Sequence, residues 1–286
     1  MESVQLSSGV LDYEDSGGDG PVIVFAGGLL MDATLWHGVV GSLAPAHRCV
    51  VVVLPLGGHR RPMDPDADLS LHALADLLAE FIETLQLDDV TLVAADWGGP
   101  QLTAARHPER LAGLVLLPEE AFDNIPPGLP GFVASLAARL PGGMFNVAHS
   151  LRLSCMWRLP ITFRWMAKRP IPREIRRSWI TGLRTERGVR RDVAKYVRTT
   201  DVTGLDQAAA ELATFARPTL VLWASEDKVM PPEHGRRLAE LIPDATLVEL
   251  DDGYTLLSLD RPDAVAAHLA EFVGGLPHAR APEAAV

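Results

Sequence analysis

The segment Val93-Ala94-Ala95-Asp96-Trp97-Gly98-Gly99 places one acidic side chain among small residues, directly after a short apolar run. The run at residues 90–94 is predicted to be a buried β-strand, and a helix is expected after the glycines. Small residues tolerate the strained backbone of a sharp turn between the two elements. The sequence therefore predicts a strand–turn–helix junction with Asp96 at its tip.

Strand and helix patterns alternate on both sides of this junction. Short apolar runs that predict strands lie at residues 22–26, 49–54, 111–117, 219–223 and 246–250, and helical spacing or composition predicts helices at 69–85, 234–241 and 263–273. Such alternation is typical of a mostly parallel sheet wrapped by helices. The fold class is therefore predicted to be α/β.

The alternation stops between Phe122 and Phe215, where the chain is helical and rich in Arg and Trp. We expect a helical cap at residues 121–215, inserted between two parts of one α/β core at residues 1–120 and 216–274. Residues 275–286 are rich in Ala, Pro and Gly, and we expect them to form a disordered tail.

Composition limits the possible functions. The chain has 286 residues, of which 48% are hydrophobic and 22% charged, as in ordinary globular proteins. Its net charge of −11 argues against nucleic-acid binding.

No apolar run is long enough to span a membrane, and the start of the chain is acidic, unlike a signal peptide. Only two cysteines occur, Cys49 and Cys155, so neither a disulfide framework nor a cysteine metal site is expected. We expect a cytoplasmic enzyme with a small-molecule substrate, no cofactor and no metal.

Charge is unevenly distributed along the chain. Residues 152–198 contain fourteen basic and three acidic side chains, a net charge near +11. Solvated helix faces explain such a segment, and so does an entrance that attracts an anionic ligand or an acidic carrier. The sequence leaves both interpretations open, and it leaves the oligomeric state open.

The Asp-Trp-Gly-Gly motif after a strand resembles the nucleophile elbow of the α/β-hydrolase superfamily, nearest to the branch of epoxide hydrolases and haloalkane dehalogenases. The resemblance covers roughly Leu11 to Val273. It implies an α/β-hydrolase fold, a doubly wound and mostly parallel sheet of about eight strands with an inserted cap. It also implies that Asp96 attacks an sp³ carbon and forms an alkyl ester, which a histidine-activated water then hydrolyses.

Other site residues follow from the resemblance. Asp227 takes the place of the family's acid, and the backbone N–H groups of Gly28 and Trp97 correspond to its oxyanion donors. The position of the catalytic histidine aligns with Tyr254. Tyrosine has a pKa near 10 and is a poor general base at neutral pH, although it can donate a hydrogen bond. Loss of general-base help costs about 10²–10⁴ in rate.

Other residues bear on the chemistry of the site, and His59 is considered as a substitute for the missing base. His59 follows a strand, but in the family this residue is mainly structural. Glu119 and Glu120 lie on the same rim as Asp96, and clustered carboxylates raise one another's pKa, so Asp96 could act as an acid or base. Tyr196 is the cap's only tyrosine, whereas epoxide hydrolases use two to protonate the epoxide. Apolar cap side chains either line a substrate cavity or form the core of the cap.

Three functions remain open. The first is hydrolysis of an epoxide, alkyl halide or ester-like substrate, with Asp96 as the nucleophile. The second is a lyase, isomerase or cyclase reaction, in which Asp96 and Tyr254 transfer protons. The third is a non-catalytic protein that binds a ligand in the inherited cavity. The sequence does not identify the substrate.

Overall fold

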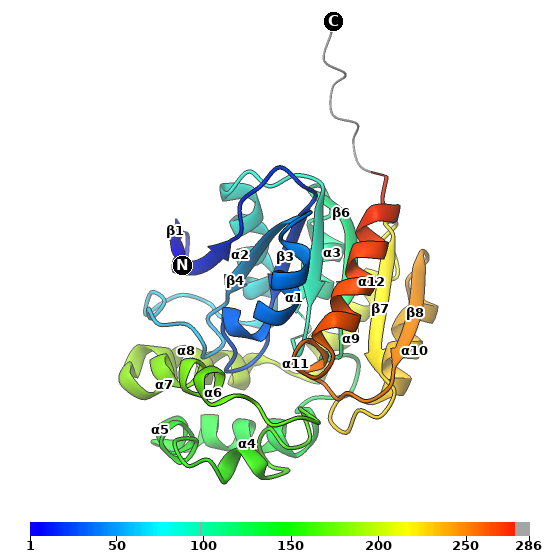
Figure 1. The fold of residues 1–286 in the computed structure, drawn as a ribbon. Coiled ribbons are helices and arrows are strands. Elements are labelled where there is room, and N and C mark those ends of the chain that lie inside the picture. Colours follow the sequence, from blue (N-terminus) through cyan, green and yellow to red (C-terminus); the bar gives the residue numbers. More distant parts are fainter. Residues whose placement is uncertain (98, 278–286) are drawn as a thin grey trace, which may run out of the picture.

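The computed structural model describes residues 1–97 and 99–277, which form an eight-stranded sheet in the order β1-β2-β4-β3-β5-β6-β7-β8 (Figure 1). The strands are β1 (Glu2–Leu6), β2 (Gly9–Asp15), β3 (Val22–Ala26), β4 (Arg48–Val53), β5 (Val90–Ala94), β6 (Leu111–Leu116), β7 (Thr219–Ala224) and β8 (Ala245–Leu250). β2 pairs antiparallel with β1 and β4, and all other neighbours are parallel. The predicted α/β-hydrolase fold is confirmed.

Helices cover both faces of the sheet. On one face α1 (His37–Leu43) packs with α11 (Leu257–Asp260) and α12 (Pro262–Gly275). On the other face α3 (Gly99–Arg106) packs between α2 (Leu71–Thr84) and α9 (Val202–Leu212), and α10 (Pro232–Leu241) contacts β7 and β8. A short helix, η1 (Ala33–Leu35), precedes α1. Every residue of β5, β6 and β7 is buried, which explains why these strands are continuous apolar runs.

Local sequence explains the helices as well. The hydroxyl of Ser70 accepts a hydrogen bond from the backbone N–H of Ala73, so Ser70 caps the start of α2. Leu74, Leu78 and Ile82 follow at helical spacing and are buried against the core. The predicted helix at residues 69–85 is therefore close to the observed one.

The cap helices follow β6. They are α4 (Gly128–Arg139), α5 (Gly143–Ser150), η2 (Met156–Arg158), α6 (Arg173–Trp179), α7 (Thr181–Thr185) and α8 (Arg187–Thr199). Figure 1 shows them below the sheet, at the carboxyl ends of the parallel strands. α9 also lies in the range 121–215 but packs against α3 of the core. The domain limits drawn from the sequence stay a prediction.

Parts of the earlier expectations lie outside the described residues. Gly98 of the elbow is one, and residues 278–286 of the proposed tail are the other. Gly275, which the tail was expected to include, is the last residue of α12. Among the described helices, none is long and apolar enough to cross a membrane.

Candidate active site

The junction after β5 turns sharply, as the sequence predicts. Asp96 has a positive φ of 63°, a conformation that non-glycine residues rarely adopt. Its backbone N–H donates to the carbonyl of Pro118 at 2.9 Å, which fixes the turn against the loop that follows β6. The strained turn directs the side chain of Asp96 away from the sheet and toward the cap.

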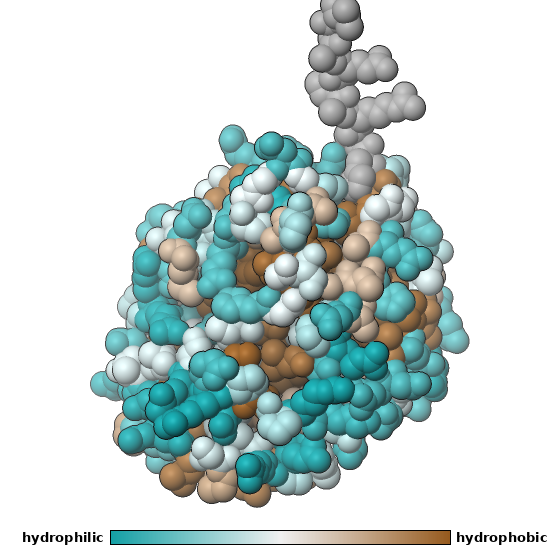
Figure 2. All heavy atoms as spheres, in the orientation of Figure 1, coloured by the Kyte–Doolittle hydropathy of each residue, from teal (hydrophilic) through white to brown (hydrophobic). Residues whose placement is uncertain are grey.

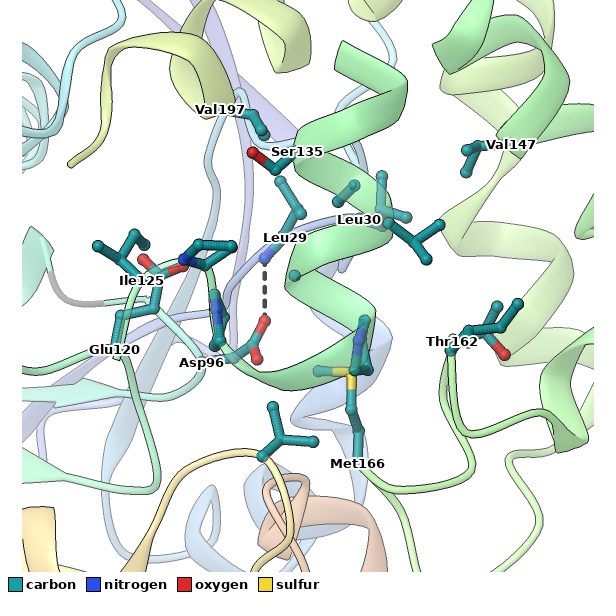
Figure 3. A pocket seen from close by; sticks show the side chains of 18 of the residues that line it. Leu29, Leu30, Asp96, Glu120, Ile125, Ser135, Val147, Thr162, Met166 and Val197 are labelled. Atoms are coloured by element: carbon teal, nitrogen blue, oxygen red, sulfur yellow. Dashed lines mark hydrogen bonds between the residues drawn. The ribbon is translucent and has the colours of Figure 1, made fainter. Parts of the chain in front are cut away.

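Asp96 lies at the core side of a partly open space between core and cap, which we call the substrate cavity. Its volume is about 450 Å³, within the range of small-molecule sites. Side chains from the cap lie across from Asp96 in Figure 3. Most of the lining is apolar, and it includes Leu29, Leu30, Ile125, Pro126, Pro130, Val133, Val147, Leu151, Met156, Ile161, Phe163, Met166, Val197 and Val229.

The backbone of the loop after β3 holds one oxygen of Asp96. Leu29 donates its N–H to Oδ2 of Asp96 at 3.1 Å (Figure 3). The preceding Gly28 has no side chain to block this approach, since a Cβ there would lie 2.4 Å from the same oxygen. The prediction that Gly28 supplies the donor is therefore corrected to Leu29. No hydrogen bond joins the N–H of Trp97 to Asp96 among the described residues, and its role stays a prediction.

The environment of Asp96 disfavours its charge. The side chain is 5% exposed, and burial raises its pKa well above the ordinary value. The negative charge of Glu120 raises the pKa further, and that of Asp227 adds a smaller increase. The Leu29 N–H acts in the opposite direction. Asp96 therefore loses its proton at a higher pH than an exposed aspartate does.

Glu120 and Tyr196 bring two more polar groups to the cavity wall. The Tyr196 hydroxyl, from α8 of the cap, donates to Oε2 of Glu120 at 2.9 Å, and both residues line the cavity. Burial, and then the charge of Glu120, raises the pKa of Tyr196 well above its ordinary value. The phenol therefore stays protonated and acts as a hydrogen-bond donor. Sequence reasoning named both residues but could not predict their contact.

Glu119 points away from the cavity. Its Oε1 accepts a hydrogen bond from Nε2 of Gln101 at 2.8 Å, while its Oε2 is buried without a partner among the described residues. Burial raises the pKa of Glu119 well above its ordinary value, and Glu120 adds to the increase. Gln101 also donates to the backbone carbonyl of Glu120, so this buried amide links Glu119 to the segment that carries Glu120.

The acid Asp227 lies in the loop after β7. Its Oδ1 accepts hydrogen bonds from the N–H groups of Val229 and Met230 and from the Thr255 hydroxyl, at 2.8, 2.9 and 2.9 Å. Its Oδ2 is buried and has no partner among the described residues. Burial raises the pKa of Asp227 to about 7 despite these donors. A nearby cation would act in the opposite direction.

The residue that faces Asp227 is therefore Thr255 and not Tyr254. Tyr254 does not line the substrate cavity, and its ring lies under the ammonium groups of Lys228 and Lys168, 4.8 and 5.7 Å from its centre. The expectation that the Tyr254 phenol faces Asp96 is corrected for this reason. A threonine hydroxyl has no accessible basic form at neutral pH, so it cannot activate water as an imidazole does.

Trp97 is buried in the core side of the junction. It is 1% exposed, it does not line the cavity, and its Nε1 has no acceptor among the described residues. The indole lies directly over Gly99, because a Cβ at Gly99 would be 1.9 Å from the Trp97 ring. In this arrangement the indole packs the elbow and does not donate into the cavity.

His59 belongs to a buried hydrogen-bond network that joins the core to the cap. Its Nδ1 accepts from the N–H of Gly57 at 3.1 Å, and its Nε2 lies 3.3 Å from Oδ2 of Asp192 on α8. Burial would raise the pKa of Asp192, but His59, the Met63 N–H and Arg191 hold it below its ordinary value. His59 is absent from the cavity lining, as are all other histidines of the described chain.

The cap's large apolar residues serve both predicted purposes. Met156, Phe163 and Met166 line the cavity. Trp157 stacks on Phe163 with ring centres 4.4 Å apart, and Trp179 packs against both rings to form the core of the cap.

Comparisons with known proteins agree with this architecture. The model of the alpha/beta hydrolase fold family matches residues 21–262. A haloalkane dehalogenase of Mesorhizobium japonicum is 23% identical over 284 residues, covering 94% of this chain and 90% of the relative. A cis-3-alkyl-4-alkyloxetan-2-one decarboxylase of Shewanella oneidensis is 28% identical over 282 residues, covering 92% and 85%.

Solved structures show the same fold. Haloalkane dehalogenase DbeA from Bradyrhizobium elkani superposes with a TM-score of 0.78 at 21% identity, over 96% of this chain and 97% of that one. A thermophilic esterase from Thermogutta terrifontis gives 0.73 at 21% identity, over 96% and 98%. With its strand order, its elbow and a family match over most of its length, the chain belongs to the α/β-hydrolase fold family and is an enzyme that resembles the haloalkane dehalogenases.

Proposed function

We propose that the protein acts on an apolar substrate of medium size and that Asp96 attacks a saturated carbon of it. The observation that carries this proposal is the position of Asp96, at the tip of a strained elbow and at the base of an apolar cavity. The names of the relatives support it, because an alkyl halide and an oxetan-2-one each carry a leaving group on saturated carbon.

The attack step needs only the ionised carboxylate. The Leu29 N–H binds Oδ2, so Oδ1 is the oxygen available to the substrate. A carboxylate that is poorly solvated is a stronger nucleophile than one in water, because it has less hydration to lose. Burial therefore has two effects on Asp96. It raises the pKa, which slows the reaction at low pH, and it makes the ionised carboxylate a stronger nucleophile.

The site differs from that of a hydrolase in the step that breaks the Asp96 ester. An alkyl ester on Asp96 must break to release the product, and hydrolysis requires a base that activates water. The side chain that contacts Asp227 is Thr255, and no histidine lines the described cavity. We propose that the ester breaks without water.

An oxetan-2-one is a substrate for which this is chemically possible. Oδ1 of Asp96 attacks the ring carbon that bears the ring oxygen, the carbon–oxygen bond breaks, and the substrate acquires a free carboxylate. That carboxylate then leaves as CO₂, its bonding electrons form the alkene, and Asp96 departs with the ester electron pair. No water is consumed and no net proton moves, so no imidazole is needed. The apolar cavity suits the alkyl groups of such a substrate.

Glu120 supports a second candidate, hydrolysis with Glu120 as the base. Glu120 lines the cavity and interacts electrostatically with Asp96. It would take a proton from water, and the resulting hydroxide would attack the carbonyl carbon of the Asp96 ester. The intermediate would then expel the alkoxide, which takes the proton from Glu120 and leaves as the alcohol, and Asp96 would retain one oxygen from water.

Isotope labelling separates the two candidates. We would incubate the enzyme with a cis-dialkyl oxetan-2-one or a haloalkane in H₂¹⁸O, then measure alkene, alcohol and the mass of the Asp96 peptide. Decarboxylation predicts alkene and CO₂ with no label in Asp96, whereas hydrolysis predicts alcohol and labelled Asp96. Asp96→Asn is expected to abolish either activity while leaving the melting temperature unchanged or higher. Full turnover by that variant would contradict both candidates.

A further inference from the structure

A second pocket opens at the surface of the cap, and Leu151 lines both this pocket and the substrate cavity. Its volume is about 260 Å³. We call it the arginine pocket, and it is lined by Leu151, Arg152, Ser154, Trp157, Arg173, Arg176, Arg177, Ile180 and Arg184. Figure 2 shows strongly hydrophilic side chains gathered over the region of α6 and α7, at the lower left of the molecule. The pocket is thus chemically unlike the apolar cavity beside it.

The five guanidinium groups of the arginine pocket have no counter-charge in the described chain. No acidic residue lines the pocket. None of the ion pairs found in residues 1–97 and 99–277 involves these arginines, although the cap's other arginines include Arg169 and Arg191, which do pair with aspartates. Glu174 and Glu186, the acids nearest in sequence, are exposed and pair with none of the five. Five positive side chains around one pocket repel one another, and a bound anion would reduce this repulsion.

Two of the arginines each have a buried N–H donor that has no acceptor in the described structure. The Nε atoms of Arg176 and Arg184 are buried and make no hydrogen bond in the described structure. A buried donor without a partner is costly and uncommon in native proteins. The Arg176 guanidinium also lies over the ring of Trp157, 5.8 Å from its centre. The Trp157 Nε1 in turn donates to the Leu151 carbonyl at 2.7 Å, so this wall is fixed.

We propose that the arginine pocket binds a small molecule through two linked phosphate groups. Guanidinium groups bind phosphate oxygens through paired N–H donors, which suits both the unpartnered Nε atoms and the planar stacking on Trp157. A monocarboxylate would leave most of the five charges unbalanced. A diphosphate carries two to four negative charges and enough oxygens to reach several arginines at once. This proposal does not depend on the reaction at Asp96.

Calorimetric titration of inorganic pyrophosphate into the full chain tests the proposal. We expect saturable binding of one pyrophosphate per chain, tighter than orthophosphate and weakened by added salt. The double variant Arg176→Gln with Arg184→Gln is expected to weaken binding at least tenfold. The matched control, Arg158→Gln with Arg187→Gln, removes the same charge from exposed cap positions outside the pocket. It is expected to change the dissociation constant less than threefold.

Further outcomes decide against the proposal. Absence of saturable binding to the wild-type chain would overturn it, and so would equal weakening by both double variants, because that result indicates only the general field of a basic cap. Should the Arg176 and Arg184 variant fail to fold, Arg173→Gln with Arg177→Gln replaces it, since both side chains are exposed at the pocket rim. That variant is expected to weaken binding at least fivefold with an unchanged melting temperature, and unaltered binding contradicts the proposal.

Discussion

Replacing Asp227 with asparagine should change how the stability of the protein depends on pH. The pKa of Asp227 is raised by burial from 3.8 to about 7. Between these values the folded chain binds more protons than the unfolded chain, so the free energy of unfolding of the wild type falls as pH rises. A shift of about 3 units corresponds to about 4 kcal/mol in total, lost between pH 4 and pH 7.

Asparagine removes this titration but introduces a cost of its own. Its oxygen can keep the donors from Val229, Met230 and Thr255, while its NH₂ takes the place of the buried Oδ2, which has no partner in the described residues. An unsatisfied buried donor costs about 1–3 kcal/mol at every pH. We therefore expect Asp227→Asn to be less stable than the wild type at pH 4.5 and as stable or more stable at pH 8.

Urea unfolding followed by tryptophan fluorescence at pH 4.5, 6, 7 and 8 measures this difference. Asp244→Asn is the control, because Asp244 is an exposed carboxylate directly before β8 and the substitution makes the same chemical change. Its difference from the wild type should not vary with pH. If the stability difference for Asp227→Asn also stays constant, or changes in the opposite direction, a cation pairs with Asp227 and our account of the missing base is wrong.

Three further predictions concern the remaining site residues. Because burial and Glu120 raise the pKa of Asp96, the rate of its alkylation by a haloalkane should increase with pH to a midpoint far above that of an ordinary aspartate; a flat profile from pH 5 to 9 contradicts this. Tyr196→Phe removes the hydroxyl that donates to Glu120 and should reduce the free energy of unfolding by about 1–3 kcal/mol, measured in urea; an unchanged midpoint opposes this expectation. His59→Gln disrupts the contact with Asp192 and should lower the melting temperature without changing the rate at which the Asp96 ester is lost, whereas a decrease near 10² in that hydrolysis rate would identify His59 as a base.

The parts of this fold that depend on regular patterns could be predicted from sequence. The apolar runs that became β3 to β7 are almost wholly buried, whereas the edge strand β8 is partly exposed. The small residues around Asp96 allow its positive φ. These features follow from local composition and from the two-sided burial of parallel strands. The same reasoning predicts a cap at residues 121–215, a range that includes α9, which packs against α3 of the core.

Side-chain directions in loops could not be predicted in the same way. The donor to Asp96 is Leu29 where Gly28 was expected, and the contact to Asp227 comes from Thr255 where Tyr254 was expected. Each error is a single residue, because successive backbone N–H groups and side chains in a loop point in different directions, and loop length sets which of them faces the site. The contact of Tyr196 with Glu120 joins residues 76 positions apart and depends on how the cap packs.

The central claim is that Asp96 is a nucleophile whose alkyl ester cannot be hydrolysed efficiently. Intact-protein and peptide mass spectrometry after incubation with a primary haloalkane tests it most directly. Our account predicts one alkyl group per chain, located on Asp96, persisting after the reagent is removed and absent from Asp96→Asn. An unmodified wild-type chain, or an adduct on any other residue, would contradict it.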